Sequence, residues 1–385
     1  MGLAAKNFCS KMKSIQMVDL QGQYLRIKNE IDNAISSVIS QAAFIQGPQV
    51  KSFSSALASY TQSPFVITCA NGTDALQIAM MALNLKPGDE VILPVHTYVA
   101  TAEVIALLGL KPVFVDVRQD HFNIDPSKLK SVLTPKTKAI VPVHLYGQCA
   151  PMEEILIFAA EHKLFVIEDT AQALGAVYTF KDGRRKFAGT MGTIGTTSFF
   201  PSKNLGCFGD GGAMFTADPE LAGRLQMIAN HGQKKKYYHE CVGVNSRLDT
   251  LQAAILEVKL RHLPTYERSR QEAAAFYDSC LSGLGEVVTP VRMPYTTHVY
   301  HQYTLKVQRR DELKSYLESR GIPTMIYYPV PLHEQVAYKQ HDLAPGSFPM
   351  AEQLSKSVLS LPMHTELDRE TMEYICASIK TFYHG

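Results

Sequence analysis

Short apolar runs alternate with helical patterns between residues 64 and 216 of the chain. The apolar runs cover residues 64–69, 90–94, 111–117, 138–143 and 164–169. They are continuous rather than alternating, which is typical of strands that are buried on both faces. The segments with a helical pattern between them include residues 73–83, 100–108 and 152–162. This order predicts right-handed strand–helix–strand crossovers, and therefore an α/β domain built on a mostly parallel sheet.

The pattern changes after residue 218. It predicts two long helices, over 249–263 and 265–284, then a strand over 300–307 and a helix over 309–320. We expect a large domain over 46–285 and a smaller α+β domain that combines 16–45 with 286–385. Residues 1–15 are expected to form a disordered leader.

Composition and charge exclude several classes of protein. The chain has 385 residues, of which 46% are hydrophobic, and a net charge of +2, so nothing favours binding to nucleic acid or to a membrane. The sequence contains no run of 18 or more apolar residues, which is the length that a membrane-crossing helix requires. Seven cysteines without a CxxC pair favour reduced thiols, a cytoplasmic location and no metal. The basic and aromatic cluster at 234–238 is expected to be a solvated loop, the alternative being a contact with an anionic ligand.

Polar residues follow the predicted strands, at the sheet edge where α/β proteins bind ligands. Gly72 and Thr73 open a helix, whose first N–H groups can hold a phosphate, although many helices start this way without a ligand. Tyr98 offers a flat face to a ring, or packs in the core. Asp169 can pair with a cation or a protonated ring nitrogen, or it caps a helix, and Gln172 lies close enough to donate a hydrogen bond.

A single lysine, Lys203, lies among apolar, hydroxyl and glycine residues. Desolvation lowers the basicity of such a lysine, and a neutral lysine can form a Schiff base; on this segment alone, a surface lysine beside a glycine turn is the alternative. Ser198 could bind a phosphate. The glycines that follow fit neither a dinucleotide fingerprint nor a P-loop. Together, the phosphate cradle, ring platform, carboxylate and lysine are what pyridoxal 5′-phosphate (PLP) requires.

Several motifs of this chain resemble the DegT/DnrJ/EryC1/StrS family of nucleotide-sugar aminotransferases, which has the aspartate-aminotransferase fold (fold type I). The resemblance covers about residues 16–380, in the same order throughout. The matching segments are 70–76, 97–101, 168–172, 198–205, 209–212, 243–249 and 321–329.

The resemblance implies a role for each candidate residue. Lys203 would carry the cofactor and move the proton, Asp169 would pair with the pyridinium nitrogen, and Gln172 would bond the phenolic oxygen. Tyr98 would stack on the ring. The implied phosphate ligands are Gly72, Thr73 and Ser198, joined by Asn245 from the neighbouring subunit of a homodimer. The implied nucleotide-sugar contacts are Arg247, Tyr327 and Tyr328.

The same resemblance implies the reaction. Related dehydratases have histidine where this chain has Lys203. The lysine favours transfer of an amino group from an amino acid, and the expected donor is glutamate. The implied acceptor is a UDP-linked 2-acetamido-3-keto sugar or its uronic acid, whose product would feed O-antigen or lipopolysaccharide synthesis. Many relatives have His-Tyr-Pro where this chain has Tyr327-Tyr328-Pro329. A dTDP-3-keto-6-deoxyhexose is therefore an alternative acceptor, and a non-catalytic sensor is a second alternative.

Overall fold

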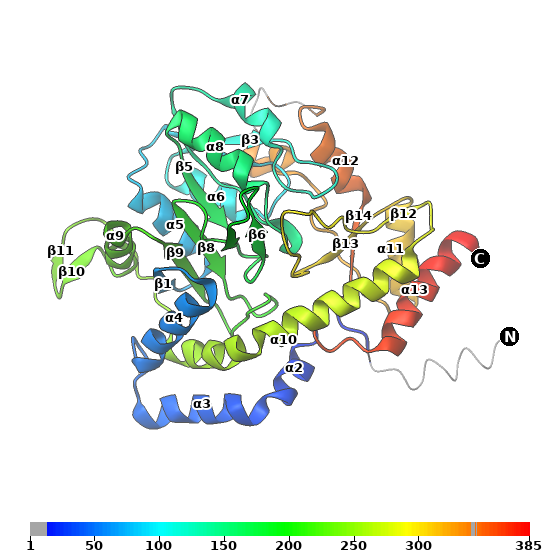
Figure 1. Ribbon diagram of the computed structural model, residues 1–385, viewed down its shortest axis with the longest axis horizontal. Coiled ribbons are helices and arrows are strands. Elements are labelled where there is room, and N and C mark those ends of the chain that lie inside the picture. Colours follow the sequence, from blue (N-terminus) through cyan, green and yellow to red (C-terminus); the bar gives the residue numbers. More distant parts are fainter. Residues whose placement is uncertain (1–13, 340–342, 344) are drawn as a thin grey trace.

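A seven-stranded sheet forms the centre of the computed structural model, which describes residues 14–339, 343 and 345–385 (Figure 1). All but two residues of the predicted leader, 1–15, lie outside the described residues. The strand order is β1-β9-β8-β5-β4-β2-β3. Strands β8, β5, β4, β2 and β3 pair in parallel, whereas β9 is antiparallel to both of its neighbours, so the prediction of a mostly parallel sheet is confirmed. The strands are β1 (Phe65–Cys69), β2 (Glu90–Pro94), β3 (Lys111–Val115), β4 (Thr137–Ile140), β5 (Phe165–Asp169), β8 (Ile194–Ser198) and β9 (Gly212–Thr216).

Helices cover both faces of this sheet. In β2, Val91 belongs to the core that holds α5 and α6, while its neighbour Ile92 belongs to the core that holds α8. Both side chains are fully buried, which explains why the strands read as continuous apolar runs. The helices of this region are α4 (Pro48–Thr61), α5 (Gly72–Ala82), α6 (Ala100–Leu107), α7 (Leu129–Val132), α8 (Met152–His162) and α9 (Pro219–Ala229).

One long helix, α10 (Thr250–Leu281), replaces the two helices predicted over 249–263 and 265–284. The prediction of a break was wrong because Pro264 lies inside the helix. A proline removes one hydrogen bond of the helix, but here the flanking Leu263 and Tyr266 are buried and hold the helix in place by packing. Figure 1 shows α10 running from below the sheet to the C-terminal part of the chain.

The C-terminal part has a core of its own around a three-stranded antiparallel sheet. The predicted strand over 300–307 begins only at Tyr303, and the predicted helix over 309–320 is Arg310–Ser319. Ile27 and Ile31, near the start of the described chain, pack on Ile255 and Val258 of α10. The proposed domain boundaries remain a prediction. The elements of these parts are α2 (Leu20–Arg26), α3 (Lys28–Gln41), β12 (Val287–Val288), β13 (Tyr303–Val307), α11 (Arg310–Ser319), α12 (Pro349–Ser357), β14 (Val358–Leu361) and α13 (Arg369–His384).

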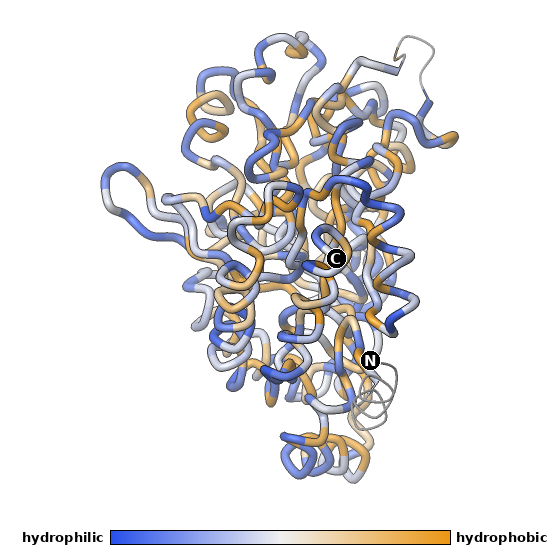
Figure 2. Tube along the Cα trace, turned by 90° about the vertical axis from the view of Figure 1, so that its right-hand side faces the viewer, coloured by the Kyte–Doolittle hydropathy of each residue, from blue (hydrophilic) through white to orange (hydrophobic). Residues whose placement is uncertain are grey.

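Two small hairpins complete the strands of the described chain: β6 (Val177–Thr179) with β7 (Arg185–Phe187), and β10 (Gln233–Lys235) with β11 (Tyr238–His239). The second hairpin projects from the body of the molecule, on the side opposite the C-terminus (Figure 1). Apolar residues run mainly through inner segments, and polar residues dominate the outer loops (Figure 2). Among the described residues, no helix combines the length and apolarity that a membrane crossing requires.

Candidate active site

A cavity of about 660 Å³ lies beyond the carboxyl ends of the parallel strands. It brings together every predicted site residue except Asn245 and Arg247. The predicted residues that line it are Gly72, Thr73, Tyr98, Asp169, Gln172, Ser198, Lys203, Tyr327 and Tyr328. These residues come from five parts of the chain, so the fold assembles what the sequence keeps apart.

Three of the four predicted phosphate ligands, Gly72, Thr73 and Ser198, meet where the start of α5 lies against the end of β8. The side chain of Asn71 caps α5 by accepting a hydrogen bond from the Asp74 N–H at 2.8 Å. A Cβ atom added to Gly72 would lie only 2.7 Å from the Cβ atom of Ser198. Glycine at position 72 therefore lets the Ser198 hydroxyl approach the free N–H groups of the helix start, which is a suitable cradle for a phosphate.

The end of strand β5 places Asp169 in the cavity, with only 7% of the residue exposed. Its Oδ2 accepts a hydrogen bond from the Thr101 hydroxyl at 2.9 Å, and its Oδ1 accepts one from the Ala171 N–H at 3.2 Å. Both contacts hold the carboxylate at the strand end. Nothing in the sequence alone pointed to Thr101 as the partner, because it lies on helix α6, 68 residues before Asp169.

Lys203 follows β8 in a turn closed by its own N–H, which donates to the Phe200 carbonyl at 2.8 Å. The surrounding protein desolvates its amine and lowers the pKa to about 8, while the negative charge of Asp169 partly opposes this shift. A substantial fraction of such a lysine is neutral near pH 8. The structure thus gives Lys203 the reduced basicity that the sequence predicted.

Gln172 links the cavity floor to the tyrosine segment. Its Oε1 accepts a hydrogen bond from the Tyr146 N–H at 2.8 Å, and its Nε2 donates to the Tyr328 hydroxyl at 3.0 Å. The rings of Tyr98 and Tyr328 lie 6.2 Å apart, and 56% of Tyr98 is exposed, which favours a ring platform over core packing. Burial raises the pKa of Tyr328, so its hydroxyl stays protonated.

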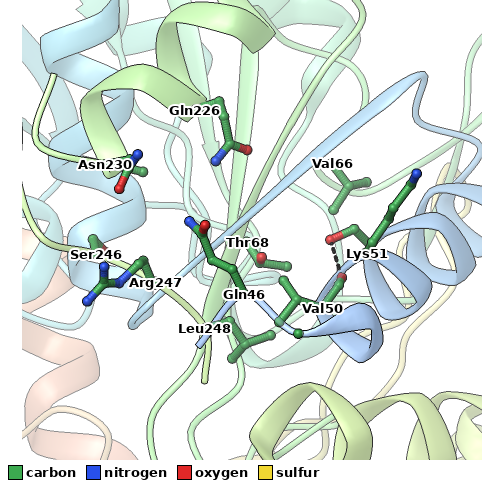
Figure 3. A pocket seen from close by; sticks show the side chains of 13 residues that line it. Gln46, Val50, Lys51, Val66, Thr68, Gln226, Asn230, Ser246, Arg247 and Leu248 are labelled. Atoms are coloured by element: carbon green, nitrogen blue, oxygen red, sulfur yellow. Dashed lines mark hydrogen bonds between the residues drawn. The ribbon is translucent and has the colours of Figure 1, made fainter. Parts of the chain in front are cut away.

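Asn245 and Arg247 lie outside this cavity. Arg247 lines a second cavity of about 360 Å³, where it lies near Gln46, Asn230 and Ser246, whereas Lys51 points away (Figure 3). Asn245 is exposed. Ser246, between them, donates to Asp74 at 2.6 Å and accepts from the Ala70 N–H at 3.0 Å, which ties this loop to the start of α5.

Two residues that the sequence reading missed, His301 and Gln302, also line the active-site cavity. They lie just before β13, and no motif in their segment separates them from ordinary core positions.

A possible metal-ligand group lies elsewhere, at the start of α12. Ligand atoms of His333, Glu334 and Glu352 lie within 4.8 Å of one another. The Glu352 carboxylate, however, already accepts the N–H groups of Gly346 and Phe348, and His333 Nε2 lies 3.2 Å from it. We interpret the group as a structural cap of α12.

Comparison with known proteins tests the family that the sequence motifs suggested. The model of the DegT/DnrJ/EryC1/StrS aminotransferase family matches residues 25–380. The chain belongs to this family. It is 46% identical to the UDP-2-acetamido-2-deoxy-3-oxo-D-glucuronate aminotransferase of Pseudomonas aeruginosa, with 95% of this chain and 99% of that protein covered. It is also 46% identical to a pleiotropic regulatory protein of Geobacillus stearothermophilus, with 96% and 99% covered.

A dTDP-sugar enzyme is nearly as similar. Identity to the dTDP-3-amino-3,4,6-trideoxy-alpha-D-glucose transaminase of Streptomyces venezuelae is 43%, with 92% of each chain covered. The crystal structure of S. venezuelae DesV in complex with a ketimine intermediate superimposes with a TM-score of 0.93 at 40% identity, covering 97% of this chain and 100% of that one. The aminotransferase family and fold expected from the sequence are therefore confirmed, whereas the sugar is not decided.

The cofactor of this family is PLP, and the cavity fits it. The cradle at Gly72 and Ser198 suits the phosphate, the face of Tyr98 suits the ring, and Asp169 and Lys203 suit its nitrogen and aldehyde. When bound, PLP supplies an electron sink that makes a C–H bond next to the amino group acidic. The protein would supply the carboxylate of Asp169 beside the ring nitrogen and the amine of Lys203 to carry the proton.

Proposed function

We propose that this aminotransferase moves an amino group from glutamate to the 3-keto carbon of UDP-2-acetamido-2-deoxy-3-keto-glucose or its uronic acid. The observation that carries the proposal is the position of Lys203, beside Asp169 in a cavity of about 660 Å³. The 46% identity to an enzyme named for the UDP-linked 3-oxo-glucuronate supports the choice of sugar. The cavity volume lies within the range of small-molecule sites.

In this proposal each side chain has a separate task. Lys203, neutral in part because its pKa is lowered to about 8, removes a proton from the carbon that bears the donor's amino group. It later returns a proton at the sugar carbon. Asp169, held by hydrogen bonds from the Thr101 hydroxyl and the Ala171 N–H, faces the ring nitrogen of the bound cofactor. A well-placed general base of this kind contributes about 10²- to 10⁴-fold to the rate.

Absorbance spectroscopy tests the reaction type first. The protein purified with PLP should show a band near ~410–430 nm that moves to ~330 nm when glutamate is added. A panel of UDP- and dTDP-linked 3-keto sugars should then restore the first band, and we expect the UDP-linked sugars to do so with the higher kcat/KM. A band that glutamate does not change would argue against glutamate as the donor, and would favour a sensor.

The second candidate acceptor is a dTDP-3-keto-6-deoxyhexose, which the 43% identity to the S. venezuelae transaminase favours. A thermal-shift comparison of UDP with dTDP separates the two, because a ligand that binds only the folded state raises the melting temperature. A larger shift with dTDP would reverse our choice of sugar. On the first choice, the product would serve O-antigen or lipopolysaccharide synthesis in the cytoplasm.

We further propose that the active unit is a homodimer in which Asn245 and Arg247 complete the partner's site. Three features support this proposal. Asn245 and Arg247 lie outside the active-site cavity of their own subunit, and Asn245 is exposed. The β10–β11 hairpin projects from the molecule with Tyr237 and Tyr238 exposed. The exposed aromatic tip of a projecting hairpin suggests a contact with another surface.

Mixing two inactive variants tests the shared site. Lys203→Ala and Asn245→Ala/Arg247→Ala should each be inactive alone. After co-refolding, mixed dimers contain one intact site, so activity should return to about a quarter of the wild-type value. If the mixture stays inactive while native mass spectrometry shows mixed dimers, Asn245 and Arg247 do not complete the site of the partner subunit.

A further inference from the structure

Arg270, on α10, is a buried cation without an acidic partner among the described residues. Only 2% of it is exposed, and burial lowers its pKa to about 10. Its Nη1 donates to the carbonyl oxygens of Tyr300 at 3.0 Å, His301 at 3.4 Å and Met363 at 3.0 Å. Burying a charge without an acidic partner costs stability. We therefore ask what Arg270 gains for the protein by binding these three carbonyl oxygens.

The segment that Arg270 holds is strained. Tyr300 adopts a φ of +46°, a left-handed conformation that non-glycine residues rarely take. Its N–H donates to His298 Nδ1 at 3.0 Å, and the two rings stack with centroids 3.9 Å apart. A Cβ atom on Gly147 would lie 2.6 Å from the Tyr300 nitrogen, so glycine at position 147 lets the two backbones meet. Strain of this kind persists only where the surroundings hold it, and it often marks a functional site.

The next two residues of this segment face the active-site cavity. His301 is 5% exposed, its Nδ1 has no hydrogen-bond partner among the described residues, and it lines the same cavity as Lys203. Burial, with the nearby charge of Lys203, lowers the pKa of the imidazole. Gln302 lies beside Tyr327 in the lining of the cavity, and its side chain partly opposes the rise that burial gives to the pKa of Tyr327. One residue therefore borders the lysine and the other borders the tyrosine that is predicted to contact the sugar.

We propose that Arg270 is a positioning residue, which holds the strained 298–302 segment so that His301 sets the position of Lys203 and Gln302 sets that of Tyr327. The proposal rests on the aminotransferase activity and not on which sugar is used. It has a specific chemical requirement, because the two N–H groups of Arg270 Nη1 are shared among three carbonyl oxygens that converge on one point. The ammonium of a lysine carries three N–H donors and can meet this requirement, whereas an apolar side chain of similar size cannot.

Three variants of the full-length holoenzyme test the role of Arg270. Arg270→Met keeps the volume but removes the donors, and Arg270→Lys keeps the donors. Arg268→Met is the matched control, because Arg268 is exposed on the same helix. Two quantities are measured: the single-turnover rate with glutamate, and the PLP concentration at which borohydride reduction fixes half of Lys203 to the cofactor.

We expect Arg270→Met to slow the glutamate step by about 10- to 100-fold, because a displacement of 1 Å at a catalytic group can cost that much. The concentration for half fixation should rise by roughly 3- to 10-fold. Arg270→Lys should restore both quantities to within about threefold, and Arg268→Met should leave them unchanged. If Arg270→Lys is as impaired as Arg270→Met, or if Arg270→Met behaves as wild type, the proposal is wrong. Lack of glutamate reactivity in the wild type would instead overturn the assigned donor.

A second pair of variants keeps the proposal testable if Arg270→Met does not fold. His301→Phe should slow the glutamate step and leave the KM of the keto sugar unchanged. Gln302→Leu should raise that KM by about 10-fold and leave the glutamate step unchanged. Equal effects of both variants on both steps would mean that the segment does not separate the two tasks, and would overturn the proposal.

Discussion

Lys203, in the loop after β8, and Lys259, on the helix that contacts this loop, both have a lowered pKa but differ in their surroundings. The pKa of Lys203 and that of Lys259 are both lowered to about 8, in each case chiefly by burial. Lys203 opens onto the active-site cavity beside Asp169. Lys259 lies on α10 with 2% of its surface exposed, donates to the Gly206 carbonyl at 2.6 Å, and lies 5.6 Å from the centre of the Phe208 ring.

The comparison separates low basicity from catalysis. A neutral amine can act in catalysis only if its nitrogen can reach a substrate. The nitrogen of Lys259 instead donates a hydrogen bond to the Gly206 carbonyl, in the loop that carries Lys203. Among the described residues, the amine of Lys203 has no hydrogen-bond partner and is therefore free to react. A perturbed pKa indicates a functional site only when a cavity and a charge partner accompany it.

The largest expected difference between the two lysines is in turnover. Lys203→Met should reduce kcat by at least about 10³-fold and abolish the visible absorbance band, because it removes both the cofactor link and the general base. Lys259→Met should retain kcat to within about fivefold, since it touches no reacting atom. Steady-state rates on the two purified variants measure the contrast. Comparable loss in both variants would show that Lys259 has a role in the chemistry.

The sequence could predict Lys203 but not Lys259. The five predicted strands are confirmed because their apolar runs are local, and the strand ends placed Asp169 and Gln172 at the correct edge of the sheet. The resemblance to a known family identified Lys203. Arg270, by contrast, acts through carbonyls 30, 31 and 93 residues away, and backbone carbonyls leave no mark in a sequence.

The pairing with Asp169 is the second feature that Lys259 lacks. Asp169→Asn should lower kcat by about 10²- to 10³-fold, because the neutral amide no longer stabilises a protonated ring. It should also lower the pKa of Lys203 further below its ordinary value, since the Asp169 charge raises it. The pH dependence of acylation of Lys203 in cofactor-free protein, read by peptide mass spectrometry, measures the second effect.

The control for this variant is Thr101→Val, which removes the hydroxyl donor but leaves the charge. It should cost about 10-fold or less. An unchanged or raised pKa of Lys203 in Asp169→Asn would mean that the carboxylate does not act on the amine.

The two lysines should contribute equally to the pH dependence of the free energy of unfolding at alkaline pH. Each has a folded-state pKa of about 8 against an ordinary value of 10.5, so between these values the unfolded state binds more protons. Each lysine should therefore contribute a rise of about 3 kcal/mol to the free energy of unfolding of the cofactor-free protein between pH 8 and 10.5. The buried thiols of Cys69, Cys149, Cys207 and Cys376 contribute a fall above pH 9, because burial raises their pKa. Below pH 8 the cost of burying the two lysine charges is fully present. Urea unfolding at pH 7.5, 9 and 10 measures the net change.

Variants isolate the two contributions, because all other titrating groups are common to them. Lys203→Met and Lys259→Met should each remove about half of the contribution that the two lysines together make to the change in unfolding free energy with pH. A rise in Lys259→Met that matches the wild type would show that the amine of Lys259 remains charged in the folded protein.

The smallest expected effect concerns the ring beside Lys259. Phe208→Leu removes a contact that favours the ammonium, and such contacts are worth about 0.5–1 kcal/mol at exposed sites. Because 44% of Phe208 is exposed, we expect the lower end of this range as a loss of unfolding free energy at pH 7. Phe208→Tyr keeps the aromatic face and is the matched control. The loss should vanish at pH 10, where Lys259 is neutral, whereas a loss that persists would show that Phe208 stabilises the loop by packing alone. Turnover should stay unchanged in both variants, because the ring contacts the lysine that has no part in the chemistry.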